Sequence, residues 1–147
     1  MPKCADVMTR DPVSCDPTDS IVRIAQLMKA QDVGAVPVVE SKSSRKLVGI
    51  VTDRDIVVKT VAGGRTVENS TARDAMTNNP TTCLEDDDVN KAVAHMSEHK
   101  VRRIPVIDAA GNLRGIIAQA DIATRVHRDK TTGELVEAIS ERGPARK

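Results

Sequence analysis

Residues 6–15 read D-V-M-T-R-D-P-V-S-C, and residues 74–83 read D-A-M-T-N-N-P-T-T-C. The match continues at this spacing of 68 residues, and after two residues drop out of the second copy it resumes at a spacing of 66, where Gly49 corresponds to Gly115. Such self-similarity indicates one supersecondary unit present twice, in which each copy needs its neighbour to bury an apolar face. We therefore expect two copies related by a pseudo-two-fold axis, with a cleft between them.

Length and composition favour one small globular module. Each copy has about 60 residues and would be marginal alone, so we expect the copies to share a core. The chain has 39% hydrophobic and 29% charged residues, which is ordinary for a soluble protein, but it has no Phe, Tyr or Trp. Single-strand nucleic-acid platforms depend on stacked aromatic rings, and the net charge of +1 supplies no basic field. Nucleic-acid binding is therefore disfavoured.

The same composition bears on the compartment. No segment approaches the roughly 20 apolar residues that span a bilayer, and Met1-Pro2-Lys3-Cys4 lacks the apolar region of a signal peptide. The three cysteines are odd in number and form no C-x-x-C pair, which argues against a disulfide scaffold. We expect a cytoplasmic protein without a membrane partner.

The apolar periodicity predicts an α/β fold in which each copy reads β-α-β-β-α after a short opening helix. In the first copy the expected elements are the opening helix 3–8, a strand 13–15, a helix through Ile21, Ile24, Ala25 and Met28, strands 36–39 and 47–51, and a helix 53–61. In the second copy Thr71 caps the opening helix, and a strand 81–83, a helix 87–99, strands 104–108 and 113–117, and a helix 119–127 follow. The expected boundaries are 3–62 for the first repeat, 63–71 for a linker, 72–128 for the second repeat, and 129–147 for a tail with one short helix.

The segment Gly49-Ile50-Val51-Thr52-Asp53-Arg54-Asp55-Ile56 carries the sharpest local signal. Thr52 and Asp55 are three residues apart where a strand ends and a helix begins, so one turn places both polar groups at the helix N-terminus. A hydroxyl and a carboxylate there can hold a vicinal diol. Read alone, however, T-x-x-D is also a common helix cap.

The duplicated unit resembles a tandem pair of CBS domains, known as a Bateman module. The matching residues are Met8-Thr9 with Pro12, Val36-Pro37-Val38-Val39 and residues 49–56 in the first copy, and Met76-Thr77 with Pro80, residues 99–106 and residues 115–122 in the second. The resemblance covers about residues 3 to 128 and looks most like a free-standing bacterial or archaeal CBS protein.

The resemblance implies binding of AMP, ADP, ATP or a related adenosyl ligand, with no obligatory cofactor. It assigns the ribose hydroxyls to Thr52 and Asp55 and the phosphate to Arg102 and Arg103. Because side chains alternate along a strand, the two arginines should point to opposite faces, and we expect Arg103 to reach the ligand while Arg102 braces the cleft or the dimer surface. The base is assigned to backbone and aliphatic side chains, for which the candidates are Cys15, Val36, Val38 and Ile104.

The second copy departs from the family pattern. Ala118 replaces Thr52, although Asp121 remains, and Gly34 and Ala35 stand where the second copy has its two arginines. We therefore expect two unequal sites, of which the one with Asp55 is the stronger.

Other constellations predict neither a metal site nor catalysis. His95 and His99 have a chelating i,i+4 spacing, but solvated helix residues are the commoner interpretation. No Ser or Cys is placed beside an oriented His as a nucleophile. Cys15 and Cys83 are repeat mates that we interpret as small buried strand residues rather than redox groups.

The sequence thus predicts a regulatory module that is not an enzyme, senses an adenine nucleotide, and changes conformation or association on binding. A homodimer is expected, since closed symmetric pairs are the commonest soluble oligomers. Two alternatives remain: a nucleic-acid-binding regulator, and a structural interaction protein with a vestigial ligand site and a protein partner that the sequence does not identify.

Overall fold

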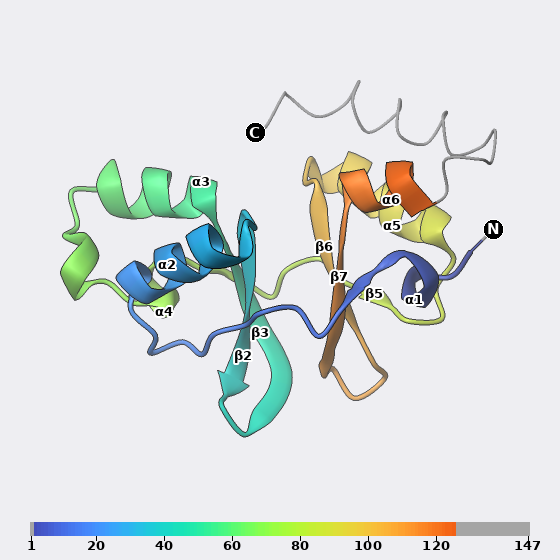
Figure 1. Ribbon diagram of the computed structural model, residues 1–147, viewed down its shortest axis with the longest axis horizontal. Helices are drawn as coiled ribbons and strands as arrows, with labels where there is room; N and C mark the ends of the chain where they lie inside the picture. Colours follow the sequence, from blue (N-terminus) through green and yellow to red (C-terminus); the bar gives the residue numbers. More distant parts are fainter. Residues whose placement is uncertain (1, 126–147) are drawn as a thin grey trace. The chain divides into compact units, whose positions relative to one another are not determined.

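The computed structural model describes residues 2–125, which form two compact α/β units. One consists of residues 12–80 and is called the 12–80 unit. The other contains residues 2–11 together with residues 81–125 and is called the 81–125 unit. Figure 1 shows the helices and strands of both units. The α/β class with two repeats is confirmed.

The 12–80 unit contains one antiparallel sheet with strand order β2-β3-β4. Cys15 extends it by a single parallel bridge to Val38. The elements are α2 (Ile21–Gln31), β2 (Ala35–Ser41), β3 (Ser44–Thr52), α3 (Asp53–Asp55), the π-helical turn η1 (Ile56–Val61), the 3-10 turn η2 (Val67–Asn69), α4 (Ala72–Ala75) and β4 (Thr77–Asn78).

The 81–125 unit contains a four-stranded sheet with strand order β1-β7-β6-β5. Its elements are α1 (Cys4–Val7), β1 (Thr9–Arg10), β5 (Cys83–Leu84), α5 (Val89–His99), β6 (Arg103–Ile107), β7 (Leu113–Ala118) and α6 (Gln119–Arg125). Strand β5 pairs in parallel with β6, with Cys83 opposite Val106. This register repeats the bridge of Cys15 to Val38 and shows that both sheets are built on one plan.

The long helices begin and end at equivalent residues in the two repeats. The side chain of Ser20 accepts the N–H of Arg23 at the start of α2, and Asp88 accepts the N–H of Asn90 at the start of α5. Each helix ends at a left-handed residue, Asp32 with φ 54° and Lys100 with φ 56°. A capping side chain satisfies an otherwise unpaired helical N–H, so the acidic run 85–88 has a local structural role.

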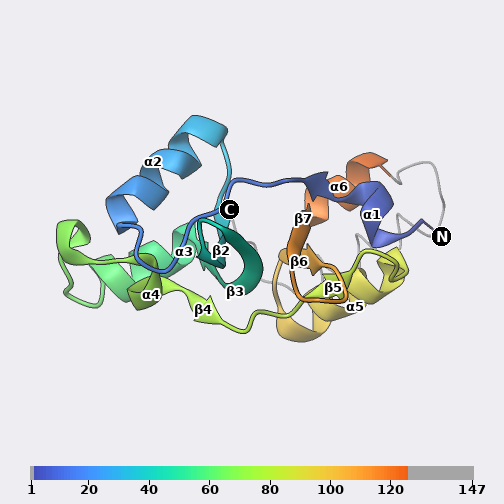
Figure 2. The same ribbon diagram turned by 90° about the horizontal axis from the view of Figure 1, so that it is seen from below.

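The two repeats exchange their opening segments. Helix α1 and strand β1 belong to the first repeat but pack in the 81–125 unit, whereas α4 and β4 belong to the second repeat and pack in the 12–80 unit. The N–H of Cys4 donates to the carbonyl of Asp87 at 2.8 Å, and the N–H of Ala72 donates to the carbonyl of Asp19 at 2.8 Å. Figure 2 shows β1 beside β7 and β4 beside β3. Each spatial unit therefore differs from a sequence repeat by one opening segment.

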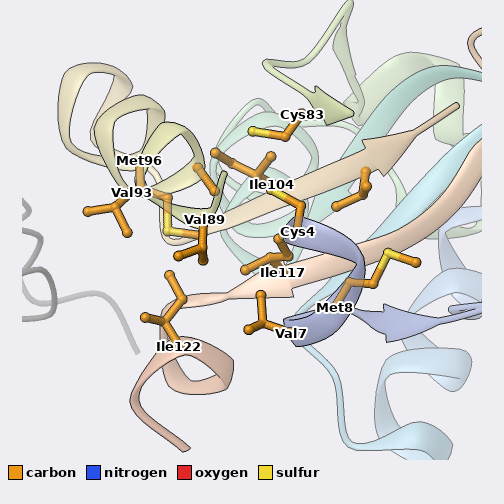
Figure 3. Close-up of a cluster of buried hydrophobic side chains, with 12 residues drawn as sticks. Cys4, Val7, Met8, Cys83, Val89, Val93, Met96, Ile104, Ile117 and Ile122 are labelled. Carbon is orange, nitrogen blue, oxygen red and sulfur yellow. The ribbon is translucent and has the colours of Figure 1, made fainter. Parts of the chain in front are cut away.

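Each unit has an aliphatic core that joins its sheet to its helices, and Figure 3 shows the core of the 81–125 unit. That core contains Cys4, Val7, Met8, Cys83, Val89, Ala92, Val93, Met96, Ile104, Val106, Ile117 and Ile122. The core of the 12–80 unit contains Cys15, Ile21, Ile24, Val36, Val38, Val51, Ala72 and Ala75. Helices α1 and α4 contribute to these cores, so each exchanged segment is part of the unit that receives it.

Several local expectations need correction. The strand expected at 13–15 is reduced to the bridge at Cys15, and the helix expected at 53–61 becomes π-helical after Asp55. Ala25, which fits the apolar spacing of α2, is exposed. The sequence did not indicate the short strands β1 and β4, since their pairing partners lie in the other repeat. The helix expected within 129–147 lies outside the described residues.

Between residues 2 and 125, no helix is both long and apolar enough to cross a membrane.

Candidate ligand-binding residues

Thr52 and Asp55 form a reciprocal cap at the end of β3. The backbone N–H of Asp55 donates to Thr52 Oγ1 at 3.1 Å, and the backbone N–H of Thr52 donates to Asp55 Oδ2 at 2.9 Å. The helix-cap interpretation of T-x-x-D is therefore realised. A hydroxyl that accepts one hydrogen bond still carries an O–H donor, and a carboxylate has several acceptor positions. Capping and diol binding are therefore compatible at these two residues.

The carboxylate of Asp55 is also held by Lys59, a residue that the sequence interpretation missed. Lys59 Nζ lies 3.4 Å from Asp55 Oδ1 and donates to the carbonyl of Ala75 at 3.2 Å. The Asp55 side chain is 15% exposed and that of Lys59 is 41% exposed. The i,i+4 spacing of an acid and a lysine was the signal that could have identified this pair. Lys59 thereby connects Asp55, the candidate ribose-binding residue, to α4, the helix that the second repeat contributes.

The backbone around Thr52 is fixed by the preceding loop and strand. The carbonyl of Gly34 accepts the N–H of Asp53 at 2.9 Å, and Ala35 lies opposite Thr52 in the β2–β3 register. The loop before β2 and the start of α3 therefore meet at one place. This place presents the Thr52 hydroxyl and the Asp55 carboxylate, and the loop before β2 supplies Gly34 and Ala35 where the second repeat has Arg102 and Arg103.

The corresponding place in the 81–125 unit has different side chains. The carbonyl of Arg102 accepts the N–H of Gln119 at 2.9 Å, and Arg103 lies opposite Ala118 in the β6–β7 register. Asp121 Oδ2 accepts the N–H of Ala118 at 2.8 Å, so half of the cap survives without the threonine hydroxyl. The fold thus gathers Arg102, Arg103 and Asp121 in one unit and Thr52 and Asp55 in the other.

The residues proposed for the base are interior residues of the two cores. Val36, Val38 and Ile104 have no exposed surface, and Cys15 is 4% exposed. Burial raises the pKa of the Cys15 thiol to about 12, so this thiol stays protonated at neutral pH. Contact of these side chains with a ligand stays a prediction, and it would require the ligand to reach the core side of the strands.

The histidines and cysteines do not assemble a metal centre within the described part of the chain, where no group of three or more His, Cys, Asp or Glu side chains is placed to hold an ion. The rings of His95 and His99 meet edge to face with centroids 6.2 Å apart. Cys83 Sγ lies 3.8 Å from His95 Nδ1.

Comparison with known proteins identifies the duplicated unit. The family model of the CBS domain matches twice, over residues 4–60 and 72–128. The chain is 38% identical over 117 residues to protein MK0525 of Methanopyrus kandleri, and the match covers 80% of this chain and 59% of that protein. It is 36% identical over 141 residues to protein YlbB of Bacillus subtilis, with 96% of this chain and 93% of YlbB covered.

Solved structures show the same arrangement of elements. The CBS domain pair of protein MJ0100, solved in complex with 5′-methylthioadenosine and S-adenosyl-L-methionine, is 26% identical with a TM-score of 0.75. The match covers 87% of this chain and 98% of that one.

Proposed function

Because the chain belongs to the CBS-domain family, we propose that it is a regulatory module that binds an adenosyl ligand, and that this ligand is an adenine nucleotide such as AMP, ADP or ATP. The observation that carries the proposal is the partly exposed Thr52–Asp55 cap at the end of β3. The adenosyl ligands bound to the CBS pair of protein MJ0100 support the ligand class.

Asp55 is proposed to bind the ribose. A carboxylate that already accepts one backbone N–H can accept hydroxyl donors at its remaining positions, and hydrogen bonds to a charged acceptor are the stronger kind. Thr52 adds a neutral hydroxyl within the same turn. Asp121 has the same backbone bond but Ala118 beside it, so we propose a weaker role for Asp121.

Arg103 is proposed to recognise phosphate. Its guanidinium offers a planar set of donors that matches phosphate oxygens, and its position opposite Ala118 fixes where the side chain leaves the sheet. The first repeat has Ala35 at the equivalent position. This arginine therefore supports a phosphorylated ligand over plain adenosine, with Arg102 beside it as the second candidate.

A thermal-shift panel tests the proposal directly. AMP, ADP, ATP, adenosine, S-adenosylmethionine, NAD and cyclic dinucleotides are compared by circular dichroism or with an extrinsic dye, because the chain has no Trp or Tyr. A ligand that binds only the folded state raises the free energy of unfolding with the logarithm of one plus its concentration over Kd, and Tm rises accordingly. We expect the mono- to triphosphates of adenosine to give the largest shifts. No shift with any adenosyl ligand would favour the structural protein with a vestigial site.

We also propose that the chain forms a homodimer through the face of η1. Val57, Val58 and Val61 are 58%, 47% and 60% exposed, an apolar group on one short helical segment that a second copy would cover. Val58→Lys should convert a dimer into a monomer in light scattering, while Val33→Lys, at an exposed valine after α2, should not. A wild-type monomer at high concentration would refute the dimer.

The role is proposed to be regulatory rather than catalytic. The Cys83 thiol, which contacts His95, is 2% exposed, so in the packed structure this Cys–His pair is not open to a substrate from solvent. Regulation then depends on a ligand that binds two conformations unequally, and its effect cannot exceed that difference in affinity.

A further inference from the structure

Two cysteines from different repeats lie in one core. Cys4 is in α1, which the first repeat contributes, and Cys83 is in β5 of the second repeat. Their side chains are 0% and 2% exposed and belong to the same cluster, where Figure 3 labels both. The N–H of Ala5 donates to the carbonyl of Glu85 at 3.0 Å, next to the bond from Cys4 to Asp87, so the backbone holds α1 against the turn that follows β5.

The two thiols influence each other directly. A hydrogen bond between the two thiols lowers the pKa of Cys83 and is the largest cause of the raised pKa of Cys4. His95 Nδ1 lies 3.8 Å from Cys83 Sγ and can take up a proton from it. Cys83 therefore has the character of an attacking thiol and Cys4 that of the thiol that resolves it.

The 12–80 unit lacks this arrangement and provides an internal control. Cys15 is the repeat mate of Cys83, but Ala72 stands in place of Cys4 and Leu27 in place of His95. Cys15 and Ala72 lie in the same core cluster, just as Cys83 and Cys4 do in theirs. Cys15 is about as buried as Cys83 but has no thiol or imidazole from these two positions beside it. A difference in reactivity between Cys15 and Cys83 therefore reports the effect of Cys4 and His95.

We propose that Cys4 and Cys83 are a redox modification site, at which a hydroperoxide converts the two thiols into a disulfide that locks α1 onto β5. The Cys83 thiolate attacks one peroxide oxygen, the O–O bond breaks, and a sulfenic acid forms. The proton that Cys83 gave up to His95 passes to the leaving oxygen, which departs as water or an alcohol. The Cys4 sulfur then attacks the sulfenic sulfur, the S–O bond breaks, and the sulfenic oxygen leaves as water with the Cys4 proton. Two sulfurs are oxidised by one electron each, and the peroxide is reduced.

Access to the buried thiols comes through α1 itself. This helix has only four residues, so its opening is a local event that does not require the remainder of the core to unfold. In the open form the oxidant reaches Cys83, and the disulfide forms when α1 returns. The disulfide would then hold α1, the opening segment of the first repeat, in its packed position in the 81–125 unit.

The test oxidises the full-length chain with hydrogen peroxide in the presence of a metal chelator. The denatured thiol titre should fall from three per chain to one, and non-reducing peptide mapping should join Cys4 to Cys83 with Cys15 still reduced. Tm should rise by about 5–15 °C, because the cross-link closes a long loop, and dithiothreitol should reverse the rise. Cys15→Ser should behave like the wild type.

Cys4→Ser and Cys83→Ser are the matched variants, each of which lacks one of the two cysteines of the proposed disulfide. Each should abolish the intramolecular disulfide and the reversible rise in Tm, and Cys4→Ser should leave a sulfenic acid on Cys83 that dimedone labels. A linkage through Cys15, intermolecular disulfides only, or three reduced thiols after oxidation would each overturn the proposal. Protection of Cys4 and Cys83 by zinc in a sample without chelator, combined with no disulfide in the chelated sample, would overturn it in favour of a metal site.

Discussion

Gly115 lies so close to Met8 that a Cβ atom added to it would stand 2.5 Å from the Met8 sulfur and 2.8 Å from the carbonyl oxygen of Thr9. Gly49 has the same relationship to Met76, at 2.8 Å from its sulfur. Each glycine is in the central part of a hairpin strand, and each methionine is in the opening segment of the other repeat. The glycine of the repeated Gly-Ile pair is therefore required by the exchange of opening segments.

Gly49→Ala and Gly115→Ala should each lower the free energy of unfolding by about 1–3 kcal/mol, since overpacking forces the backbone of β4 or β1 away from its partner strand. Chemical denaturation followed by circular dichroism measures the loss. Lys46→Ala, at an exposed position of β3, is the control and should change stability little. Wild-type stability for both alanine variants would mean that the exchanged segments do not pack against these glycines.

Asp55→Ala should weaken binding of the adenine nucleotide by about 1.5–3 kcal/mol, the usual value of hydrogen bonds to a charged group. Asp121→Ala should weaken it less, because Ala118 supplies no second partner. Titration calorimetry compares the two variants. Asp55→Asn, which keeps an acceptor for the Thr52 N–H, separates loss of the charge from loss of the cap. A larger loss for Asp121→Ala would reverse the ranking of the two carboxylates.

Arg103→Ala should reduce affinity for AMP or ATP and leave the affinity for adenosine nearly unchanged, because only the phosphate needs the guanidinium. The salt dependence of nucleotide binding should flatten in the same variant. Arg103→Lys should recover part of the affinity but not all of it. Equal losses for adenosine and AMP would show that Arg103 supports the fold rather than the ligand.

Lys59→Met should loosen the end of α4 while leaving the rest of the 12–80 unit folded. The variant loses the bonds to Asp55 and to the carbonyl of Ala75, contacts of a half-exposed lysine that are worth at most about 1 kcal/mol. Hydrogen exchange at the Met76 amide, which donates to Ala72, should accelerate about two- to fivefold. The equivalent Met8 amide in the other unit is the internal reference, and equal acceleration at both amides would contradict the local connection.

Acid should weaken the cap of α4. The backbone N–H of Thr71 donates to Asp74 and holds the pKa of that carboxyl below its ordinary value of 3.8, with Arg65 contributing. A depressed pKa stabilises the fold above the unfolded pKa, and this contribution is lost as pH falls below 3.8 through the folded pKa. Asp74→Asn should therefore flatten the acid limb of the stability profile. A variant profile that keeps the wild-type acid limb would show that Asp74 carries no such stability.

The sequence by itself determined the repeat, the class of fold and the local structure. The spacing that relates residues 6–15 to residues 74–83 and the resemblance to a CBS pair predicted two α/β repeats, which the structure and the family match confirm. The β2–β3 and β6–β7 hairpins, the helix α5 with Val89, Val93 and Met96 buried, and the Thr71 cap also followed from local patterns. These features depend on neighbours a few residues apart, and such interactions are visible in a linear sequence.

Only the tertiary structure decided which repeat each opening segment joins. A helix of four residues is too short for its apolar periodicity to indicate which surface it packs against. The strands β1 and β4 consist of two residues each, so they are recognised as strands only through the distant strand that pairs with them. The same exchange brings Cys4 to Cys83 and Lys59 to Ala75. These contacts join residues far apart along the chain, and the packing of one repeat's opening segment into the other repeat's core selects them.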